Sequence, residues 1–281
     1  MSSVLYDAPG PRARTRNRVL AAVFTVVLLA LAYFVYVKFD EKGQWAAEKW
    51  KPLVQGDVWR TYLIPGIRGT VTAALAAGVL ALVFGAVFGL GRLSDHWWVR
   101  LPAGAVVEFF RAIPLLILIF FAFFGSFAVL GVTISAFAAV VFGLTLYNGS
   151  VIAEIVRAGV LAVPRGQWEA AYAIGLRKGA VMRLILLPQS VRSMLPVLIS
   201  QLVVLLKDSA LGYIIAYIEL LHQTDQIGAQ FGNIVPASIL VAGIYIALNL
   251  TLGWLATVVE RHSRRRGQRV LHADQQALET A

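Results

Sequence analysis

The sequence predicts an all-α integral membrane protein with six transmembrane helices, and three observations carry that prediction. Of its 281 residues, 59% are hydrophobic and only 14% are charged, whereas about a quarter of the residues in a soluble domain are charged. The mean hydropathy is +0.74. A helix that crosses a hydrocarbon core of about 30 Å needs roughly 20 mostly apolar residues. Six stretches meet this requirement: 19–37, 67–91, 101–124, 134–155, 194–218 and 234–259.

The chain begins with a basic segment, residues 1–18, that we expect to be a disordered tail. Four arginines lie in it, so a cleaved signal peptide is one alternative for the apolar run 19–37 that follows. That run is longer than the apolar core of about 7–15 residues found in signal peptides, and no small-residue cleavage site follows it. We therefore expect residues 19–37 to be retained as an N-terminal transmembrane helix.

Residues 38–66 form the longest segment expected on the exterior side of the membrane. Aromatic side chains recur along it at Trp45, Trp50, Trp59 and Tyr62, as in a helix that lies at the level of the lipid headgroups. We expect this segment to be a brace on the membrane surface. Docking of an external partner is the alternative interpretation.

Small residues in the second apolar stretch, 67–91, predict that this stretch packs inside a bundle. Lipid provides no hydrophobic driving force between helices, so close packing depends on residues that let two backbones approach. Five glycines lie among its alanines: Gly69, Gly78, Gly85, Gly89 and Gly91. A packed bundle is therefore favoured over a single membrane anchor.

Ionisable side chains inside a membrane are costly, so each one in a predicted span is a candidate functional residue. Glu108 and Arg111 lie three residues apart on one helix face, where they can neutralise each other. Alternatively, the guanidinium of Arg111 could bind the carboxylate of a zwitterionic substrate through two hydrogen bonds. The candidate substrate-pathway residues are Glu108, Arg111, Lys207 and Asp208, and ion pairs that only fix helix register are the alternative.

Glu154 and Arg157 lie near the end of the fourth stretch, 134–155. Their spacing places them on one helix face next to the polar segment that follows. We expect this pair to be a structural brace for that segment instead of a ligand-binding pair.

The basic residues that give the chain its net charge of +10 are unevenly distributed along the sequence. Arginines and lysines concentrate in residues 1–18, 92–100 and 156–193 and after residue 260. Basic loops tend to remain on the cytoplasmic side of a membrane, so we expect both termini and residues 156–193 to be cytoplasmic. Orientation and attraction to anionic lipids account for the charge, and we expect no nucleic-acid partner.

The sequence offers no catalytic constellation. It contains no cysteine, so neither a disulfide nor a thiolate metal site can form, and we expect no bound metal. The phosphate-binding pattern G-x-x-x-x-G-K-[ST] is absent, and no nucleophile is paired with a base. We therefore expect that the chain is not an enzyme and holds no cofactor of its own.

Residues 164–188 are too polar to cross a membrane and too regular to be a slack loop. Pro164 can begin a helix, because its missing N–H would be unpaired in the first turn anyway. Gly175 suits the left-handed position that ends a helix, and a second helical run is expected over 177–186, with Pro188 before the next span. This pattern predicts a short helix–glycine–helix elbow.

The first half of this elbow has the character of a docking surface. Ala170 and Ala171 leave the backbone bare enough to enter a groove of a partner, and Glu169 offers a carboxylate to position it. The spacing Glu169-Ala170-Ala171, three residues, Gly175, nine residues and Ile185-x-Leu-Pro188 resembles the EAA loop of bacterial ABC importer permeases.

Further blocks are similar to signatures of the polar amino acid permease subfamily. They include VEFFRAIPLL in 107–116 and LKDSAL in 206–211, and the similarity covers about 66–260. Ala112-Ile113 departs from the commoner Gly-Thr, and Ser209-Ala210 from the commoner Thr-Ser. The added first span and long exterior segment resemble actinobacterial glutamate-type permeases.

The resemblance implies the five-helix core of a type I ABC importer over 67–260, with one added N-terminal helix and a cytoplasmic C-terminal tail over 261–281. It implies that the elbow is the coupling helix, held in a groove of a cytoplasmic ATPase. The residues that would make this contact are Gly166, Gln167, Glu169, Ala170, Ala171 and Gly175.

The resemblance also implies partners. They are an ABC ATPase dimer that binds ATP and Mg, a second and related permease chain, an extracellular solute-binding protein, and a polar amino acid of glutamate or glutamine type as cargo in a bacterial cell membrane. An ion-coupled secondary transporter would show inverted repeats, and none is seen in the sequence. A membrane scaffold without transport activity is the other alternative.

Overall fold

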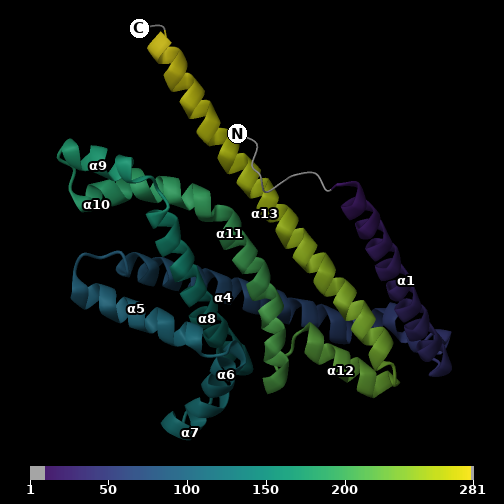
Figure 1. Cartoon of the computed structure of the whole chain (residues 1–281). Coiled ribbons are helices and arrows are strands. Elements are labelled where there is room, and N and C mark those ends of the chain that lie inside the picture. Colours follow the sequence, from purple (N-terminus) through teal and green to yellow (C-terminus); the bar gives the residue numbers. More distant parts are fainter. Residues whose placement is uncertain (1–9, 280–281) are drawn as a thin grey trace.

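Figure 1 shows the computed structural model of the chain, which describes the backbone of residues 10–279 and the side chains of residues 10–255, 257 and 258. In this part of the chain every regular element is a helix. Five helices are long and apolar enough to cross a membrane, and a sixth span results if one sharply bent pair is counted together. The predicted all-α class with six spans is confirmed.

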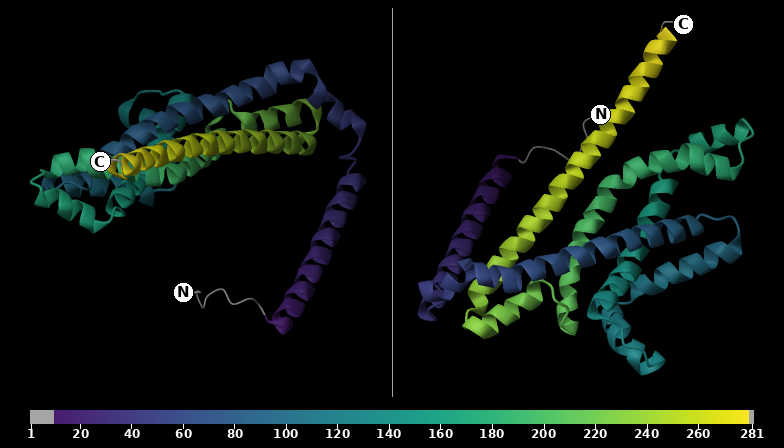
Figure 2. Two further views of the ribbon diagram at one scale, coloured as in Figure 1. Left: turned by 90° about the horizontal axis from the view of Figure 1, so that it is seen from above. Right: turned by 180° about the vertical axis from the view of Figure 1, so that it is seen from behind.

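The N-terminal helix α1 (Pro11–Glu41) stands apart from the other helices (Figure 2). None of its residues is buried. The helix begins inside the segment 1–18, because Pro11 occupies the first turn and arginine has a high helix propensity. The expectation of a disordered tail is therefore wrong from Pro11 onward, while residues 1–9 lie outside the described part of the chain.

The segment after α1 consists of short turns instead of the single surface helix expected. Gly43 has φ +59 and Pro52 lacks an amide donor, and both interrupt a continuous helix. The elements are α2 (Ala47–Trp50), the 3-10 turn η2 (Lys51–Val54) and α3 (Gly56–Val58).

Tryptophans attach this segment to its own main chain. Each of three indole N–H groups donates to a backbone oxygen: Trp45 to Tyr36 (3.2 Å), Trp50 to Gln44 (2.9 Å) and Trp59 to Leu53 (2.8 Å). Leu53 and Val58 are buried in a cluster with Leu220 and Ile227. The segment therefore packs on the bundle end formed by the last two helices.

Two prolines follow π-helical turns. The turn η3 (Trp59–Leu63) precedes Pro65 in α4 (Ile64–Gly91), and η5 (Met182–Leu186) precedes Pro188 in α11 (Leu187–Asp208). A proline lacks the N–H and crowds the carbonyl four residues earlier, and a wider turn accommodates both defects. Pro188 therefore lies inside one continuous helical run, Lys178–Ile215, instead of separating the elbow from the fifth span.

The third predicted span, 101–124, is present as a bent pair of helical segments instead of one continuous helix. Helix α5 (Trp97–Ala112) ends before Ile113, whose extended backbone (ψ 128) is the conformation favoured before a proline. After Pro114 the chain continues through α6 (Leu115–Phe120), the π-helical turn η4 (Phe121–Gly125) and α7 (Ser126–Leu130). The two halves meet at 98°.

The contact between α4 and α8 (Ala136–Leu161) is the most extensive of all helix pairs. A Cβ added to Gly85 would lie 2.3 Å from Cγ2 of Ile152, and one added to Gly89 would lie 2.7 Å from the carbonyl oxygen of Ala153. No side chain fits at either position, which is how small residues bring two membrane helices together.

At the end of the bundle opposite the elbow, residues 216–219 turn sharply after the 3-10 segment η6 (Ser209–Ile215) and lead into α12 (Leu220–Phe231). Glu219 caps α12 by accepting hydrogen bonds from its own helix and from Tyr245: Leu221 N (2.8 Å), His222 N (2.6 Å) and Tyr245 Oη (2.7 Å). Burial raises the pKa of the Glu219 carboxyl, and these donors oppose that rise.

The last helix, α13 (Ile234–Glu279), runs back along α11. The segment 261–281, expected as a tail, therefore has a helical backbone as far as Glu279. Both α4 and α8 end near the elbow and α11 leads away from it, so the spans alternate in direction (Figure 1).

We predict that Gly69→Ala destabilises the chain by about 1–3 kcal/mol, the usual cost of overpacking. A Cβ at Gly69 would lie 1.8 Å from the carbonyl oxygen of Ile218, so the turn at 216–219 would be displaced from α4. Gly104→Ala is the matched control, because a Cβ there has no neighbour within 4 Å. Thermal unfolding of both purified variants in detergent checks this, and equal midpoints would contradict it.

Candidate functional site: the elbow and an ion cluster

The elbow, residues 164–188, contains two helices, α9 (Arg165–Ala173) and α10 (Lys178–Val181). Pro164 lies at the N-cap, one residue before the first turn in which it was expected. Gly175 adopts φ +82, as predicted. Its N–H donates to Tyr172 O (2.9 Å) and the next N–H, of Leu176, donates to Ala171 O (3.2 Å), which is the Schellman arrangement of a helix end.

The two faces of α9 differ. Gly166, Gln167, Glu169 and Ala170 are exposed, and Glu169 makes no hydrogen bond or ion pair with another described residue. Ala171 is only 3% exposed. The structure thus corrects the expectation that Ala171 leaves the backbone bare for a partner, since its side chain faces the protein.

Ala171 belongs to an apolar cluster between the elbow and the rest of the bundle. The cluster joins the elbow to the end of α8 and to the loop after α4, and its members include Val160, Val163, Ala171, Val181 and Leu186, with Leu93 and Leu176 packed against them. The exposed residues of α9 therefore rest on a packed base, which limits their freedom to move independently of the bundle.

A second attachment joins α10 to the loop between α4 and α5, residues 92–96. Nζ of Lys178 donates to Leu93 O (2.9 Å) and forms an ion pair with Asp95. The hydrogen bond from Lys178 holds the pKa of the Asp95 carboxyl below its usual value.

Five charged residues from three segments form an ion cluster beside this loop: Arg92, Glu108, Arg111, Glu154 and Arg157. Glu154 lies within 2.6 Å of Arg92, 2.5 Å of Arg157 and 3.6 Å of Arg111. Glu108 lies 3.3 Å from Arg92. The predicted proximity of Glu154 and Arg157 is present, but Glu154 also ties α8 to α5 and to the end of α4.

Glu108 and Arg111 form no ion pair with each other, contrary to expectation. Each instead contacts a less exposed group of another element, Glu108 the guanidinium of Arg92 and Arg111 the carboxylate of Glu154. The side chain of Arg92 is 13% exposed and that of Glu154 is 27% exposed. Charges attract more strongly where less water surrounds them, so the interhelical partners prevail over the spacing within α5.

The cluster has a shielded half and an open half. Arg92 and Glu154 are shielded, whereas the side chains of Glu108 and Arg111 are 71% and 44% exposed. The open half faces the surroundings of this single chain, where it is accessible to a ligand or to another protein.

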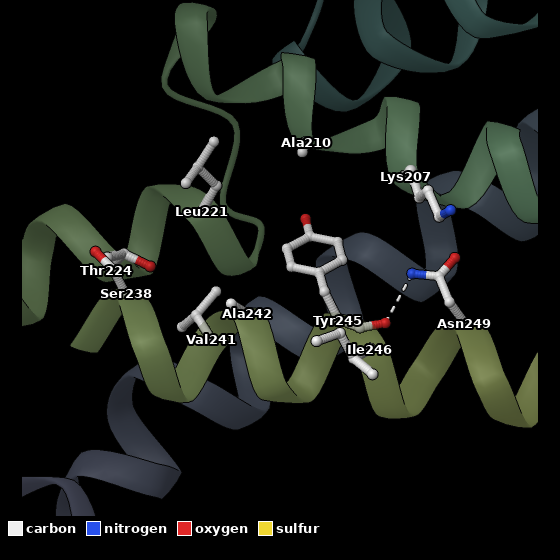
Figure 3. A pocket seen from close by; sticks show the side chains of 10 residues that line it. All are labelled: Lys207, Ala210, Leu221, Thr224, Ser238, Val241, Ala242, Tyr245, Ile246 and Asn249. Atoms are coloured by element: carbon white, nitrogen blue, oxygen red, sulfur yellow. Dashed lines mark hydrogen bonds between the residues drawn. The ribbon is translucent and has the colours of Figure 1, made fainter. Parts of the chain in front are cut away.

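Lys207 and Asp208 lie elsewhere, so the four candidate pathway residues do not meet. Lys207 lines a pocket of about 420 Å³, and Figure 3 shows its ammonium near the amide of Asn249. Lys207 makes no hydrogen bond or ion pair within the described chain. Asp208 lies beside Asn148, which is fully buried and accepts a hydrogen bond from Nε2 of Gln201 (2.7 Å).

Sequence reasoning missed several residues of these sites. Arg92 was assigned only to a basic loop, and Asn249, Thr224 and Tyr245 of the Lys207 pocket were not considered. Asn249 carried a signal, as an amide in the middle of an uncharged apolar stretch. Among the described residues, no group of three or more acidic or histidine side chains could hold a metal ion.

Comparison with known proteins identifies the family to which this chain is similar. The family described as "Binding-protein-dependent transport system inner membrane component" matches residues 81–265, which contain the elbow and the whole ion cluster. The glutamate transport system permease protein GluD of Corynebacterium glutamicum is 48% identical over 224 residues, which cover 79% of this chain and 82% of that protein. The probable amino-acid ABC transporter permease protein YckA of Bacillus subtilis is 37% identical, over 66% of this chain and 82% of its own length.

Two solved structures share the fold. The crystal structure of an amino acid ABC transporter with histidines has a TM-score of 0.67 and 31% identity, and the match covers 71% of this chain and 92% of that one. An inward-facing MetNI methionine ABC transporter has a TM-score of 0.62 at 22% identity, with coverage of 74% and 99%. The chain belongs to the family of binding-protein-dependent transport system inner membrane components, the membrane permeases of ATP-binding-cassette importers.

Proposed function

We propose that this chain is the permease subunit of an importer that moves a polar amino acid, with glutamate or glutamine as the leading candidates, into the cytoplasm. The single observation that carries the coupling part is the exposed face of α9, held on a packed base and ended by the left-handed Gly175. The amino acid part rests on the relatives GluD, whose name specifies glutamate transport, and YckA, whose name specifies an amino-acid transporter. The ion-coupled transporter and the scaffold are not favoured by these relatives.

The exposed face of α9 suits insertion into a groove of an ATPase. Gly166 and Ala170 carry little or no side chain, so the helix backbone can approach a partner closely. Gln167 and Glu169 add polar groups for orientation, and Glu169 is free to pair with a donor of the partner. ATP and Mg would be bound by that ATPase, and its closure would move the elbow and the helices behind it.

The orientation follows from charge. Arg177, Lys178 and Arg183 lie in the elbow, and Arg92 lies in the neighbouring loop. By the tendency of basic loops to remain inside, the elbow faces the cytoplasm together with both termini, and an extracellular solute-binding protein delivers cargo at the opposite end.

The substrate pathway requires a second permease chain, related to this one, because the candidate residues of this chain are open on one side. Arg111 offers a guanidinium for an α-carboxylate, and Glu108 offers a carboxylate for an α-ammonium. Lys207 and Asp208 provide the same pair of charges nearer the other end. Arg92 holds Glu108, and Glu154, braced by Arg157, holds Arg111.

Co-purification tests the proposal as a whole. The tagged chain is extracted from its own membranes in mild detergent, and the proteins that accompany it are identified by mass spectrometry. An ATPase and a second permease chain are expected. Repeated recovery of the folded chain alone would contradict the proposal.

We predict that Glu169→Lys and Gly175→Leu abolish most uptake while the chain still inserts into the membrane. The first reverses a charge on the docking face, and the second strains a left-handed position by about 1–2 kcal/mol. Gly179→Ala is the control, since Gly179 lies in the same elbow with no atom within 4 Å of an added Cβ. Uptake of labelled substrate and hydrolysis of ATP are measured together, and normal uptake in both variants would refute the docking role of α9.

We predict that Arg111→Ala raises the apparent substrate constant roughly tenfold or more, because a hydrogen bond to a charged group contributes about 1.5–3 kcal/mol. Arg192→Ala is the control, since Arg192 is exposed and its side chain makes no hydrogen bond or ion pair with another described residue. Initial rates of uptake over a range of substrate concentrations are the measurement. Unchanged kinetics would show that Arg111 serves only the ion cluster.

A further inference from the structure

The loop that joins α4 to α5, residues 92–96, contacts both the coupling elbow and the ion cluster. We propose that this loop is the joint through which displacement of the elbow reaches the cluster, with Lys178 and Asp95 as the positioning residues. The inference rests on the proposed function, in which an ATPase moves the elbow, and it adds the route by which that movement reaches the membrane helices.

The elbow holds this loop at two points. Nζ of Lys178 contacts both the carbonyl oxygen of Leu93 (2.9 Å) and the carboxylate of Asp95. The side chain of Leu93 packs on the apolar cluster that contains Val181 and Leu186 of the elbow. Leu93 is therefore bound to the elbow through its side chain and through its main chain.

The other end of the loop is fixed to the ion cluster. Arg92 directly precedes Leu93, and consecutive Cα atoms are about 3.8 Å apart, so the chain has no slack between them. The guanidinium of Arg92 lies 2.6 Å from Glu154 on α8 and 3.3 Å from Glu108 on α5. A shift of the elbow must therefore move Arg92 against its carboxylates or break the contacts of Lys178.

The cluster can take up such a shift by exchange of partners. Glu154 has three arginine neighbours and Arg92 has two carboxylate neighbours, so losing one contact leaves neither charge unpaired. An uncompensated charge in a shielded site would be strongly destabilising, and this multiplicity avoids it. Movement of Arg92 would thereby alter how Glu108 and Arg111, on the open side of the cluster, are held.

Lys178 and Asp95 contribute little to holding the fold together. Their side chains are 36% and 71% exposed, and exposed ion pairs add little to stability. Their removal should leave the chain folded and assembled while loosening the joint. This separation makes coupling, and not stability, the quantity to measure.

The test uses the importer reconstituted in liposomes with its ATPase, second permease and solute-binding protein. Substrate uptake per ATP hydrolysed is compared for the unmodified chain, Lys178→Ala, Asp95→Ala, the double variant and Lys178→Arg. Arg177→Ala is the matched control, because the neighbouring Arg177 is exposed and its side chain makes no hydrogen bond or ion pair with another described residue.

We expect uptake per ATP to fall at least about fivefold in Lys178→Ala, the lower range of coupling between distant sites, with assembly unchanged. The double variant should fall no further than Lys178→Ala, because the two residues act as one unit. Lys178→Arg should retain coupling, since arginine can donate to both oxygens. Normal coupling in Lys178→Ala would overturn the inference and leave the proposed function standing, whereas absence of ATP-driven uptake by the unmodified chain would refute the proposed function itself.

A distance measurement keeps the inference testable if the alanine variants fail to assemble. The chain has no native cysteine, so spin labels can be placed at Arg183→Cys in the elbow and His96→Cys in the loop, both exposed positions. The distance between the labels should be the same in the nucleotide-free and the vanadate-trapped importer. A change between the two states would show that the elbow moves without the loop, and the inference would fail.

Discussion

The close approach of α4 and α8 is the constraint on which the rest of the structure depends. Gly85 and Gly89 leave no room for a Cβ against Ile152 and Ala153, so the two backbones lie nearly in contact. Inside a membrane no hydrophobic effect drives one helix against another. Helices α4 and α8 therefore associate through close van der Waals packing, which only small residues at the contact allow. It also fixes where the ends of α4 lie, with Gly69 beneath the turn at 216–219 at one end and Arg92 beside Glu154 at the other.

Because that contact places Arg92 beside α8, a carboxylate can be tolerated at Glu154. A charge shielded from water is costly unless it has close partners and hydrogen bonds, and Glu154 has three guanidinium groups around it. These groups come from the end of α4, from α5 and from α8 itself. The cluster therefore depends on helix packing that brings distant parts of the sequence together. Its ion pairs in turn fix how α4, α5 and α8 are aligned along one another.

Local features of the fold could be predicted from the sequence, and long-range ones could not. The spans and the helix end at Gly175 depend on short windows of hydropathy and on one backbone conformation. Pro114 carried a local signal for the bend after α5, but the angle is set by tertiary contacts. The ion-pair partner of Glu108 and the burial of Ala171 depend on which element packs opposite each residue. The three-residue spacing within α5 therefore predicted the wrong partner for Glu108, and the small size of alanine predicted an exposed position for a residue that is buried.

The four candidate pathway residues fall into two groups because different contacts hold them. Glu108 and Arg111 are held by the ion cluster near the elbow, whereas Lys207 projects into a pocket between α11, α12 and α13. The α12 side of that pocket is fixed by Glu219, which caps the helix and accepts a hydrogen bond from Tyr245 of α13. Opposite charges thus occur toward both ends of the bundle. The charges near the elbow are paired across helices, whereas the ammonium of Lys207 lines its pocket without an ion partner among the described residues, so the pocket and not a neighbouring carboxylate determines where that charge lies.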